Sequence, residues 1–318
     1  MPASVSPTLD HIVLLLPPQV LTNVPSWLTD SFTIINGGQH AGGVTENKLI
    51  IFEDGSYIEL IAFVEGVDPD KRAATRWGKR REGEIVDWAL TLLPRGSEHS
   101  EPEPLPETFF PAIRDRINSI QTDFTYADLV GGGRTTPDGI ELRWAIAAPV
   151  ELTQQDSESR HLVEGKLPFW CLDRTPRYLR VPHIRSDAIT RHPCGATGVA
   201  RLSVSVHRHS EQVKKLSKVY DAILDQEADY VVVEPLVSGF HWALQVPVPQ
   251  ASATETQLVL REFTEKDLSE KALAEASGNS SDHARVDIAL FVRGAGSKTL
   301  SGEVGDGRTL DIELIGVA

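Results

Sequence analysis

Residues 9–16, LDHIVLLL, and residues 57–63, YIELIAF, decide the fold. Both runs are rich in branched apolar residues and have the length of a buried strand. Because side chains alternate along a strand, His11 shares a face with Leu9, and Glu59 lies on an equally apolar face of the second strand. Each predicted strand therefore carries one ionisable group where the protein core is expected.

A third polar residue, His40, lies in the glycine-rich segment GGQHAGG, residues 37–43, which is expected to be a loop. A buried carboxylate is costly unless a cation or a hydrogen-bond donor compensates for it. A metal ion held by His11, His40 and Glu59 would supply that compensation most economically. The alternative is a metal-free pair in which His11 is hydrogen-bonded to Glu59, with His40 an ordinary loop histidine.

Composition narrows the class of partner. The chain has 318 residues, 41% of them hydrophobic, and its net charge of -14 argues against nucleic acid and anionic membranes. No run approaches the roughly 18 apolar residues of a membrane helix, and no signal peptide is recognisable, so a cytoplasmic location is expected. The two cysteines, Cys171 and Cys194, lack zinc-ligand spacing and are expected to be reduced. The expected partner is a small-molecule substrate.

One order of elements, a strand, a helix and three strands, recurs along the chain. Residues 1–65 hold the first copy, residues 66–198 a second copy with loop insertions and a helix over 111–120, and residues 199–318 a third, diverged copy with an inserted helix over 264–276. The elements expected in the first copy are strand 9–16, a helix near 24–30, and strands 32–35, 47–52 and 57–63. The pattern predicts an α+β protein made of repeated βαβββ modules.

Such modules are expected to pair. One module cannot bury both faces of its sheet, so copies should place their concave faces together, giving curved, barrel-like sheets with a ligand cleft between modules. Three modules leave one without a partner in the chain, which allows for a homodimer. Residues 312–315, IELI, repeat residues 58–61, but Ser203 occupies the place of His11 in the third copy, so no second metal site is expected.

These motifs resemble one known superfamily. Residues 9–13, residues 37–40 with Asn47, and residues 57–61 together are similar to the glyoxalase-like branch of the vicinal oxygen chelate superfamily. The resemblance covers roughly residues 8–206. It continues through Trp77, residues 87–90, residues 134–144, residues 168–170, and residues 192–193 with Gly195. The superfamily includes isomerases, ring-cleaving dioxygenases, antibiotic-modifying thiol transferases and metal-free drug-binding proteins, so the fold alone does not choose the reaction.

The resemblance implies a metal site on the concave face of the sheet, with ligands from the first and fourth strands. In this chain those ligands are His11 and Glu59. Paired members of the superfamily take further ligands from the second module, where this chain has Trp88 and Trp170. With His40 as third ligand, the set of two histidines and one carboxylate suits Fe²⁺, Mn²⁺ or Zn²⁺ and leaves positions open for substrate.

Four residues are expected to contact the substrate. Arg134 follows the glycines of the second module as a histidine follows those of the first, and its guanidinium could clamp a carboxylate or an enolate oxygen. Its alternative role is a salt bridge to Asp138. Trp88 and Trp170 are expected as pocket walls or, alternatively, as core aromatics. Asn47 belongs to the matching motif and is assigned to the same pocket.

The expected function is that of a metal-dependent enzyme that acts on a small oxygenated metabolite through two neighbouring oxygens chelated by the ion. A redox-inactive metal would support isomerase or lyase chemistry, with Glu59 or His40 moving the proton, whereas Fe²⁺ would support dioxygenase chemistry. The competing hypothesis is a metal-free protein of the same fold that binds or sequesters a small molecule. A third hypothesis is a scaffold that has lost its chemistry.

Overall fold

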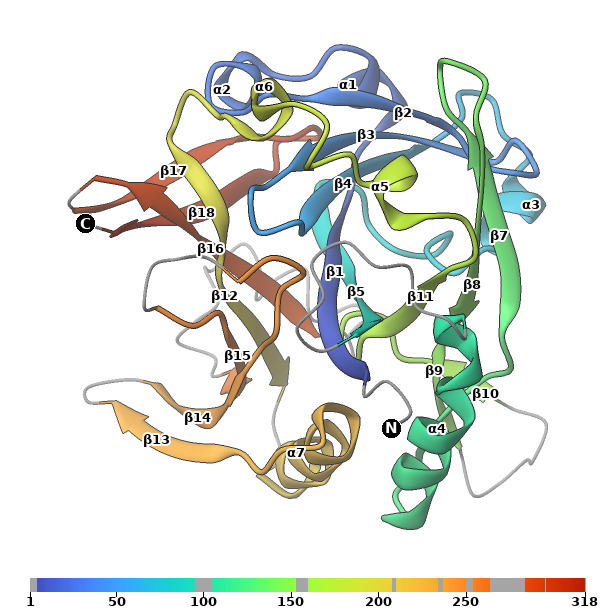
Figure 1. Ribbon diagram of the computed structural model, residues 1–318, viewed down its shortest axis with the longest axis vertical. Helices are drawn as coiled ribbons and strands as arrows, with labels where there is room; N and C mark the ends of the chain where they lie inside the picture. Colours follow the sequence, from blue (N-terminus) through green and yellow to red (C-terminus); the bar gives the residue numbers. More distant parts are fainter. Residues whose placement is uncertain are drawn as a thin grey trace.

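The computed structural model contains two large β-sheets, one from each half of the chain, with helices packed around them (Figure 1). It describes residues 5–94, 105–152, 160–207, 210–233, 237–249, 254–263, 284–294 and 296–317. The helix expected over 264–276 lies outside these residues. Within them, no helix is long and apolar enough to cross a membrane. The predicted α+β class is confirmed.

Eight strands form the N-terminal sheet, in the order β2, β3, β4, β1, β5, β11, β8, β7. Their bounds are β1 Val5–Leu15, β2 Ile35–Gln39, β3 Thr45–Ile51, β4 Tyr57–Phe63, β5 Glu84–Pro94, β7 Val130–Thr135, β8 Glu141–Ala147 and β11 Phe169–Asp173. Strand β1 runs parallel to β4 and antiparallel to β5, and β5 runs parallel to β11. The two halves of the sheet therefore repeat one pairing pattern.

Short elements connect these strands. The helices are α1 Pro18–Thr22, α2 Ser26–Thr29, α3 Pro69–Ala73, α4 Phe110–Ser119, α5 Arg177–Arg180 and α6 Asp187–Thr190, with a 3-10 turn at Pro106–Thr108. Strands β6 Phe124–Tyr126, β9 Pro149–Leu152 and β10 Arg160–Leu162 form a separate small sheet. The helix predicted over 111–120 agrees with α4, and α4 follows β5 as α1 and α2 follow β1.

The glycine-rich segment 37–43, expected to be a loop, begins within strand β2, and glycines 131–133 lie in β7; these two strands are the two ends of the sheet. Strand β2 begins only at Ile35, so the strand expected over 32–35 is wrong in its position. Gly38 adopts φ +129, and a Cβ there would come within 2.4 Å of the carbonyl oxygen of Thr135. Glycine thus permits a close approach of two backbones, which hydrophobic periodicity does not reveal.

The ends of the sheet meet at this point. The backbone N–H of Ala41 donates to the carbonyl of Gly133 at 2.8 Å, and His40 stands opposite Arg134 in an isolated antiparallel bridge. The contact curls the sheet into a nearly closed barrel. It also places two of the predicted site residues side by side.

The C-terminal sheet repeats the pairing pattern, in the order β13, β14, β15, β12, β16, β18, β17. The bounds here are β12 Ala196–His207, α7 Ser210–Leu224, β13 Asp229–Val233, β14 Val237–Ala243, β15 Gln257–Phe263, β16 Arg285–Arg293, β17 Ser297–Glu303 and β18 Thr309–Val317. Strand β12 runs parallel to β15 and antiparallel to β16, and β16 runs parallel to β18. From β12 onward, the described residues thus form one strand–helix–three-strand set followed by three more strands. The module boundaries themselves stay a prediction.

An aromatic core lies between the sheets. Trp88 of β5 stacks on Tyr220 of α7, with ring centroids 6.1 Å apart, and Tyr220 packs on Trp242 of β14 at 5.1 Å. Trp170 of β11 packs against Phe110 of α4 at 6.1 Å. Both β5 and β11 therefore direct these tryptophans away from the interior of the barrel and into the main core.

One histidine of this core has a fixed protonation state. Nδ1 of His192 accepts from the backbone N–H of Thr33 at 3.1 Å, and Nε2 donates to the carbonyl of Ile51 at 3.1 Å. Since a carbonyl can only accept, Nε2 carries the proton and Nδ1 carries none. Burial lowers the pKa of His192 from the ordinary 6.5 to about 4, against the opposing effect of the Ile51 carbonyl.

This histidine should make folding sensitive to acid. Because the folded state binds the proton more weakly than the unfolded state, stability is fully present above pH 6.5 and falls as the pH drops toward 4, by up to about 3 kcal/mol. Urea unfolding of wild type and His192→Gln at pH 7, 6, 5 and 4 isolates the effect as the difference between the two curves. Parallel curves for the two proteins would refute it.

Candidate functional site

His11 points into the barrel because β1 is irregular at this point. The pairing of β1 with β5 shifts register between Leu9 and His11, which marks a β-bulge. Leu9 packs in the main core, whereas His11 faces the barrel interior with Val13. The expectation that His11 and Leu9 share a face is therefore wrong, since strict alternation does not hold across a bulge.

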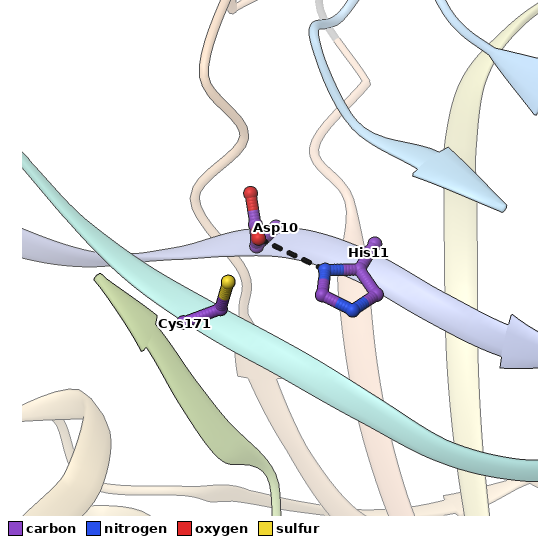
Figure 2. A group of neighbouring side chains, drawn as sticks. All are labelled: Asp10, His11 and Cys171. Carbon is purple, nitrogen blue, oxygen red and sulfur yellow. Dashed lines mark hydrogen bonds and ion pairs between the residues drawn. The ribbon is translucent and has the colours of Figure 1, made fainter. Parts of the chain in front are cut away.

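Asp10, the residue within the bulge, fixes the orientation of His11. Its Oδ2 lies 2.9 Å from Nδ1 of His11, and Figure 2 marks this contact with a dashed line. Burial opposes ionisation of Asp10, but Arg177, Arg180 and His11 outweigh it, so the pKa of Asp10 lies well below its ordinary value. The carboxylate therefore accepts a hydrogen bond from the Nδ1–H of His11, which turns Nε2 toward Glu59.

Arg180 of α5 neutralises two buried carboxylates. Its guanidinium donates to Asp10 at 3.0 and 3.1 Å, to Asp173 at 2.6 and 2.8 Å, and to the hydroxyl of Tyr57 at 2.8 Å. Burial lowers the pKa of Arg180, but the two carboxylates raise it well above the ordinary value. Arg177 also contacts Asp10. These arginines hold the carboxylate of Asp10, which in turn orients the ring of His11.

Glu59 lies at the centre of the site, 5% exposed. Nε2 of His11 is 3.6 Å from its Oε2, Nε2 of His40 is 3.5 Å from its Oε1, and the amide of Asn47 donates to Oε1 at 2.5 Å. Among the residues that the structure describes, no Lys or Arg nitrogen comes within 4.0 Å of this carboxylate. Its direct contacts among the described residues are two imidazoles and an amide.

The environment of His40 keeps its imidazole neutral. Nδ1 contacts the hydroxyl of Thr45 at 2.9 Å. Burial is the main cause that lowers the pKa of His40, and Arg134 and His11 add to it, while Glu59 opposes it. A neutral imidazole is the form that binds a metal or accepts a proton. The structure thus brings His11, His40 and Glu59 together, as the sequence predicts.

The donor types fit a divalent metal, although the contacts of Glu59 are spread. The two histidines approach different oxygens of Glu59. Among the described residues, the ligand atoms that all lie within 4.8 Å of one another belong to Asp10, His11 and Cys171 (Figure 2). Two guanidinium groups already compensate Asp10, so an added cation is better placed at Glu59, which has none.

The second module offers a cysteine, Cys171, where the first module has Glu59. Ala89 of β5 pairs directly with His11 of β1. Cys171 stands two residues beyond the partner of Ala89 on β11, as Glu59 stands two residues beyond the partner of His11 on β4. An alanine and a cysteine thus hold the places of the histidine and the glutamate, so the second module has neither the imidazole nor the carboxylate of the first.

Trp88 and Trp170 do not line the cavity. Both are fully buried in the core on the opposite face of the sheet from His11, so their role as pocket walls is wrong and their alternative role as core aromatics is correct. Side chains alternate between the two faces of a strand, so the residues next to these tryptophans, Ala89 and Phe169, face the barrel interior instead. The sequence-based prediction was therefore one residue out of register on both strands.

The site opens into a cavity of about 190 Å³. That volume exceeds the roughly 150 Å³ of an engineered cavity that accepts benzene. Tyr57 stacks on the ring of His11 at 4.7 Å, and Phe169 meets it edge-on at 5.3 Å. The lining residues are His11, His40, Ala41, Thr45, Asn47, Leu49, Tyr57, Glu59, Trp77, Gly132, Gly133, Arg134, Trp144, Ile146, Phe169, Cys171 and Arg180. A small ligand with apolar parts can therefore reach Glu59.

Arg134 also lines this cavity, as expected. Its guanidinium donates to the carbonyl of Gly37 and, at 3.5 Å, to the carbonyl of Arg180. The salt bridge to Asp138 considered as an alternative is not formed, because Asp138 instead accepts from Thr136. Burial lowers the pKa of Arg134.

The cysteines provide a simple test of this geometry. Burial raises the pKa of the Cys171 thiol well above its ordinary value. It also raises the pKa of the Cys194 thiol, which is only half-buried. Because the thiolate is the reactive form, native protein should be alkylated by iodoacetamide at Cys194 long before Cys171. Mass spectrometry of the two peptides over time, with and without urea, measures both rates. Equal native rates would show that Cys171 is accessible.

Comparison with known proteins gives three results. A family model described as a glyoxalase-like domain matches residues 9–220. No curated protein matches the chain. The fold is similar to the crystal structure of a hypothetical protein from Staphylococcus aureus, with a TM-score of 0.58, 14% sequence identity, and coverage of 97% of this chain and 99% of that one. A xylose isomerase-like TIM barrel/4-hydroxyphenylpyruvate dioxygenase fusion protein matches at a TM-score of 0.45 and 16% identity, over 92% of this chain and 38% of that one.

Proposed function

The chain belongs to the glyoxalase-like domain family, and from this premise we propose that it is a metal-dependent enzyme acting on a small oxygenated metabolite. The observation that carries the proposal is the buried carboxylate of Glu59, contacted by His11 and His40 and by no Lys or Arg among the described residues. A bound Fe²⁺, Mn²⁺ or Zn²⁺ would compensate this charge and would stabilise negative charge developing on vicinal oxygens of the substrate.

The residues of the chain have distinct parts in this proposal. His11 and Glu59 would hold the metal, with His40 as the third ligand or as the group that moves a proton. Asp10 holds His11 in the required tautomer. Asn47 donates to Oε1 of Glu59 and so orients the carboxylate. It also lines the cavity, where it would contact the substrate. The apolar walls of the cavity would exclude water from the reacting atoms.

The reaction type follows from the metal. Protein loaded anaerobically with Fe²⁺, Mn²⁺ or Zn²⁺ would be incubated with α-hydroxy ketones, catechols and thiohemiacetals of α-oxo aldehydes. Proton NMR would follow substrate loss, and an oxygen electrode would separate dioxygenase from isomerase or lyase chemistry. We expect turnover by loaded wild type and at least about a hundredfold less by Glu59→Gln.

Glu313→Gln is the matched control for this experiment. Glu313 lies in the sequence repeat of the Glu59 segment, but it is 42% exposed and paired with Arg201. This variant should behave as wild type. Turnover that persists in Glu59→Gln, or ligand binding by wild type without metal and without turnover, would contradict the proposal and favour a metal-free binding protein.

A further inference from the structure

Arg134 is a buried cation that faces the cavity without an acidic partner. It is 6% exposed, and within the described part of the chain its hydrogen bonds go to two backbone carbonyls. Among the described residues, no carboxylate oxygen lies within 4.0 Å of its guanidinium. Carbonyl oxygens accept some of the hydrogen bonds of an arginine but do not neutralise its charge. The guanidinium of Arg134 could therefore bind an anionic ligand.

The other arginine that lines the cavity, Arg180, is already paired. Arg180 contacts Asp10 and Asp173. Arg134 is thus the cavity-lining cation that forms no ion pair with a described residue. Burial lowers its pKa, and the Glu59 carboxylate of the same cavity opposes this effect. Its position in the bridge opposite His40 places it on the same side of the cavity as the predicted metal site.

A second donor lies on the wall next to Arg134. The indole N–H of Trp144 makes no hydrogen bond within the described part of the chain, and a Cβ added at Gly132 would come within 2.4 Å of this nitrogen. Glycine at position 132 therefore lets the indole of Trp144 pack closely against β7. A guanidinium and an indole N–H on neighbouring strands suit a ligand with two acceptor oxygens.

Charge balance points the same way. Glu59 and Arg134 contribute opposite single charges to the cavity, and a divalent metal would leave an excess of two positive charges when the imidazoles are neutral. Such an excess is costly in an apolar cavity unless the ligand brings negative charge. This step rests on the proposed function, whereas the unpaired Arg134 does not.

We propose that the cavity binds a small carboxylic acid in its ionised form and that Arg134 holds the carboxylate. A guanidinium binds a carboxylate through two parallel N–H donors, which fixes its orientation as well as its charge. The remaining oxygens of the acid would then lie toward Glu59 and the histidines, and its carbon skeleton against Trp144, Ile146 and Phe169. The substrate class of the enzyme is accordingly a small oxygenated carboxylate.

Calorimetric titration with paired acids and amides tests this assignment. The probes are acetate and acetamide, lactate and lactamide, and mandelate and mandelamide. Acetate is included because its size cannot exclude it. For wild type we expect each acid to bind at least about tenfold more tightly than its amide, and for Arg134→Gln we expect this preference to be lost.

Two further variants control for charge and folding. Arg134→Lys keeps the charge but not the paired donors, and should regain part of the preference. Arg143→Gln removes an exposed arginine from the adjacent strand β8 and should bind as wild type. If Arg134→Gln does not fold, the comparison of acid with amide in wild type and in Arg134→Lys still decides. Acids that bind wild type no more tightly than amides, or equally tightly to folded Arg134→Gln, overturn the proposal.

Metal analysis of the same samples separates this proposal from the proposed function. Arg134→Gln should keep the metal content of wild type while losing the preference for acids. A metal-free wild type that still prefers acids through Arg134 would support the carboxylate site and refute the metal-dependent enzyme. Loss of metal together with acid binding in Arg134→Gln would show that Arg134 acts through the metal, and would overturn its role as the carboxylate-binding group.

Discussion

Replacing Arg180 by Met is expected to lower the free energy of unfolding by about 3–5 kcal/mol. The substitution keeps the approximate length of the side chain but removes the cation between Asp10 and Asp173, both of which are buried. Arg177 alone cannot contact all four carboxylate oxygens as closely, because its contact to Asp173 is 3.4 Å long. Urea unfolding at pH 7 measures the loss.

Arg191→Met is the matched control for Arg180→Met. Arg191 also pairs with an aspartate, Asp187, but at 3.8 Å and with both side chains largely exposed. Exposed pairs of this kind contribute about 0–1 kcal/mol, so this variant should unfold nearly as wild type. Similar losses of unfolding free energy in the two variants would mean that the buried ion pairs of Arg180 stabilise the fold no more than an exposed pair does.

Glu59→Gln should have opposite effects on the metal-free and the metal-loaded protein. Without metal, the substitution removes a buried charge that has no Lys or Arg within 4.0 Å among the described residues, so it should stabilise the fold by about 1–3 kcal/mol. The amide can still accept from Asn47 and donate to a neutral imidazole. With metal at a thousand times its Kd, wild type should gain about 4 kcal/mol and the variant almost nothing.

Thermal and urea unfolding, each with EDTA and with saturating Mn²⁺ or Zn²⁺, measure these two opposite effects on stability. Glu313→Gln should show the wild-type response in both conditions, since Glu313 is partly exposed and is not one of the residues that line the cavity. A Glu59→Gln protein that is less stable than wild type in EDTA, yet gains as much from the metal, would contradict the assignment of Glu59 as a ligand.

Much of the fold and part of the site can be predicted from sequence. The runs around His11 and Glu59 are long, apolar and β-branched, so they become central strands whatever their surroundings. The polar residues within them then identify the site, and Arg134 follows from the internal repeat. Such features are local, and local patterns are what a sequence displays directly.

The supporting network could not be predicted in the same way. Arg180 reaches Asp10 across 170 residues of chain, and nothing in its own surroundings marks it as a core residue. Asp10 did carry a signal, because a second polar residue beside His11 interrupts an apolar strand. The bulge that brings both into place, and the register that turns Trp88 away, are set by strand pairing and are not visible in periodicity.

Metal content tests the central claim most directly. Wild type, Glu59→Gln and Glu313→Gln would be purified without a metal-affinity tag and examined by inductively coupled plasma mass spectrometry, before and after incubation with Fe²⁺, Mn²⁺ and Zn²⁺. We predict about one ion per chain in wild type and Glu313→Gln and almost none in Glu59→Gln. Wild type that contains no metal and takes up none of the three ions would contradict the metal-dependent site at His11 and Glu59.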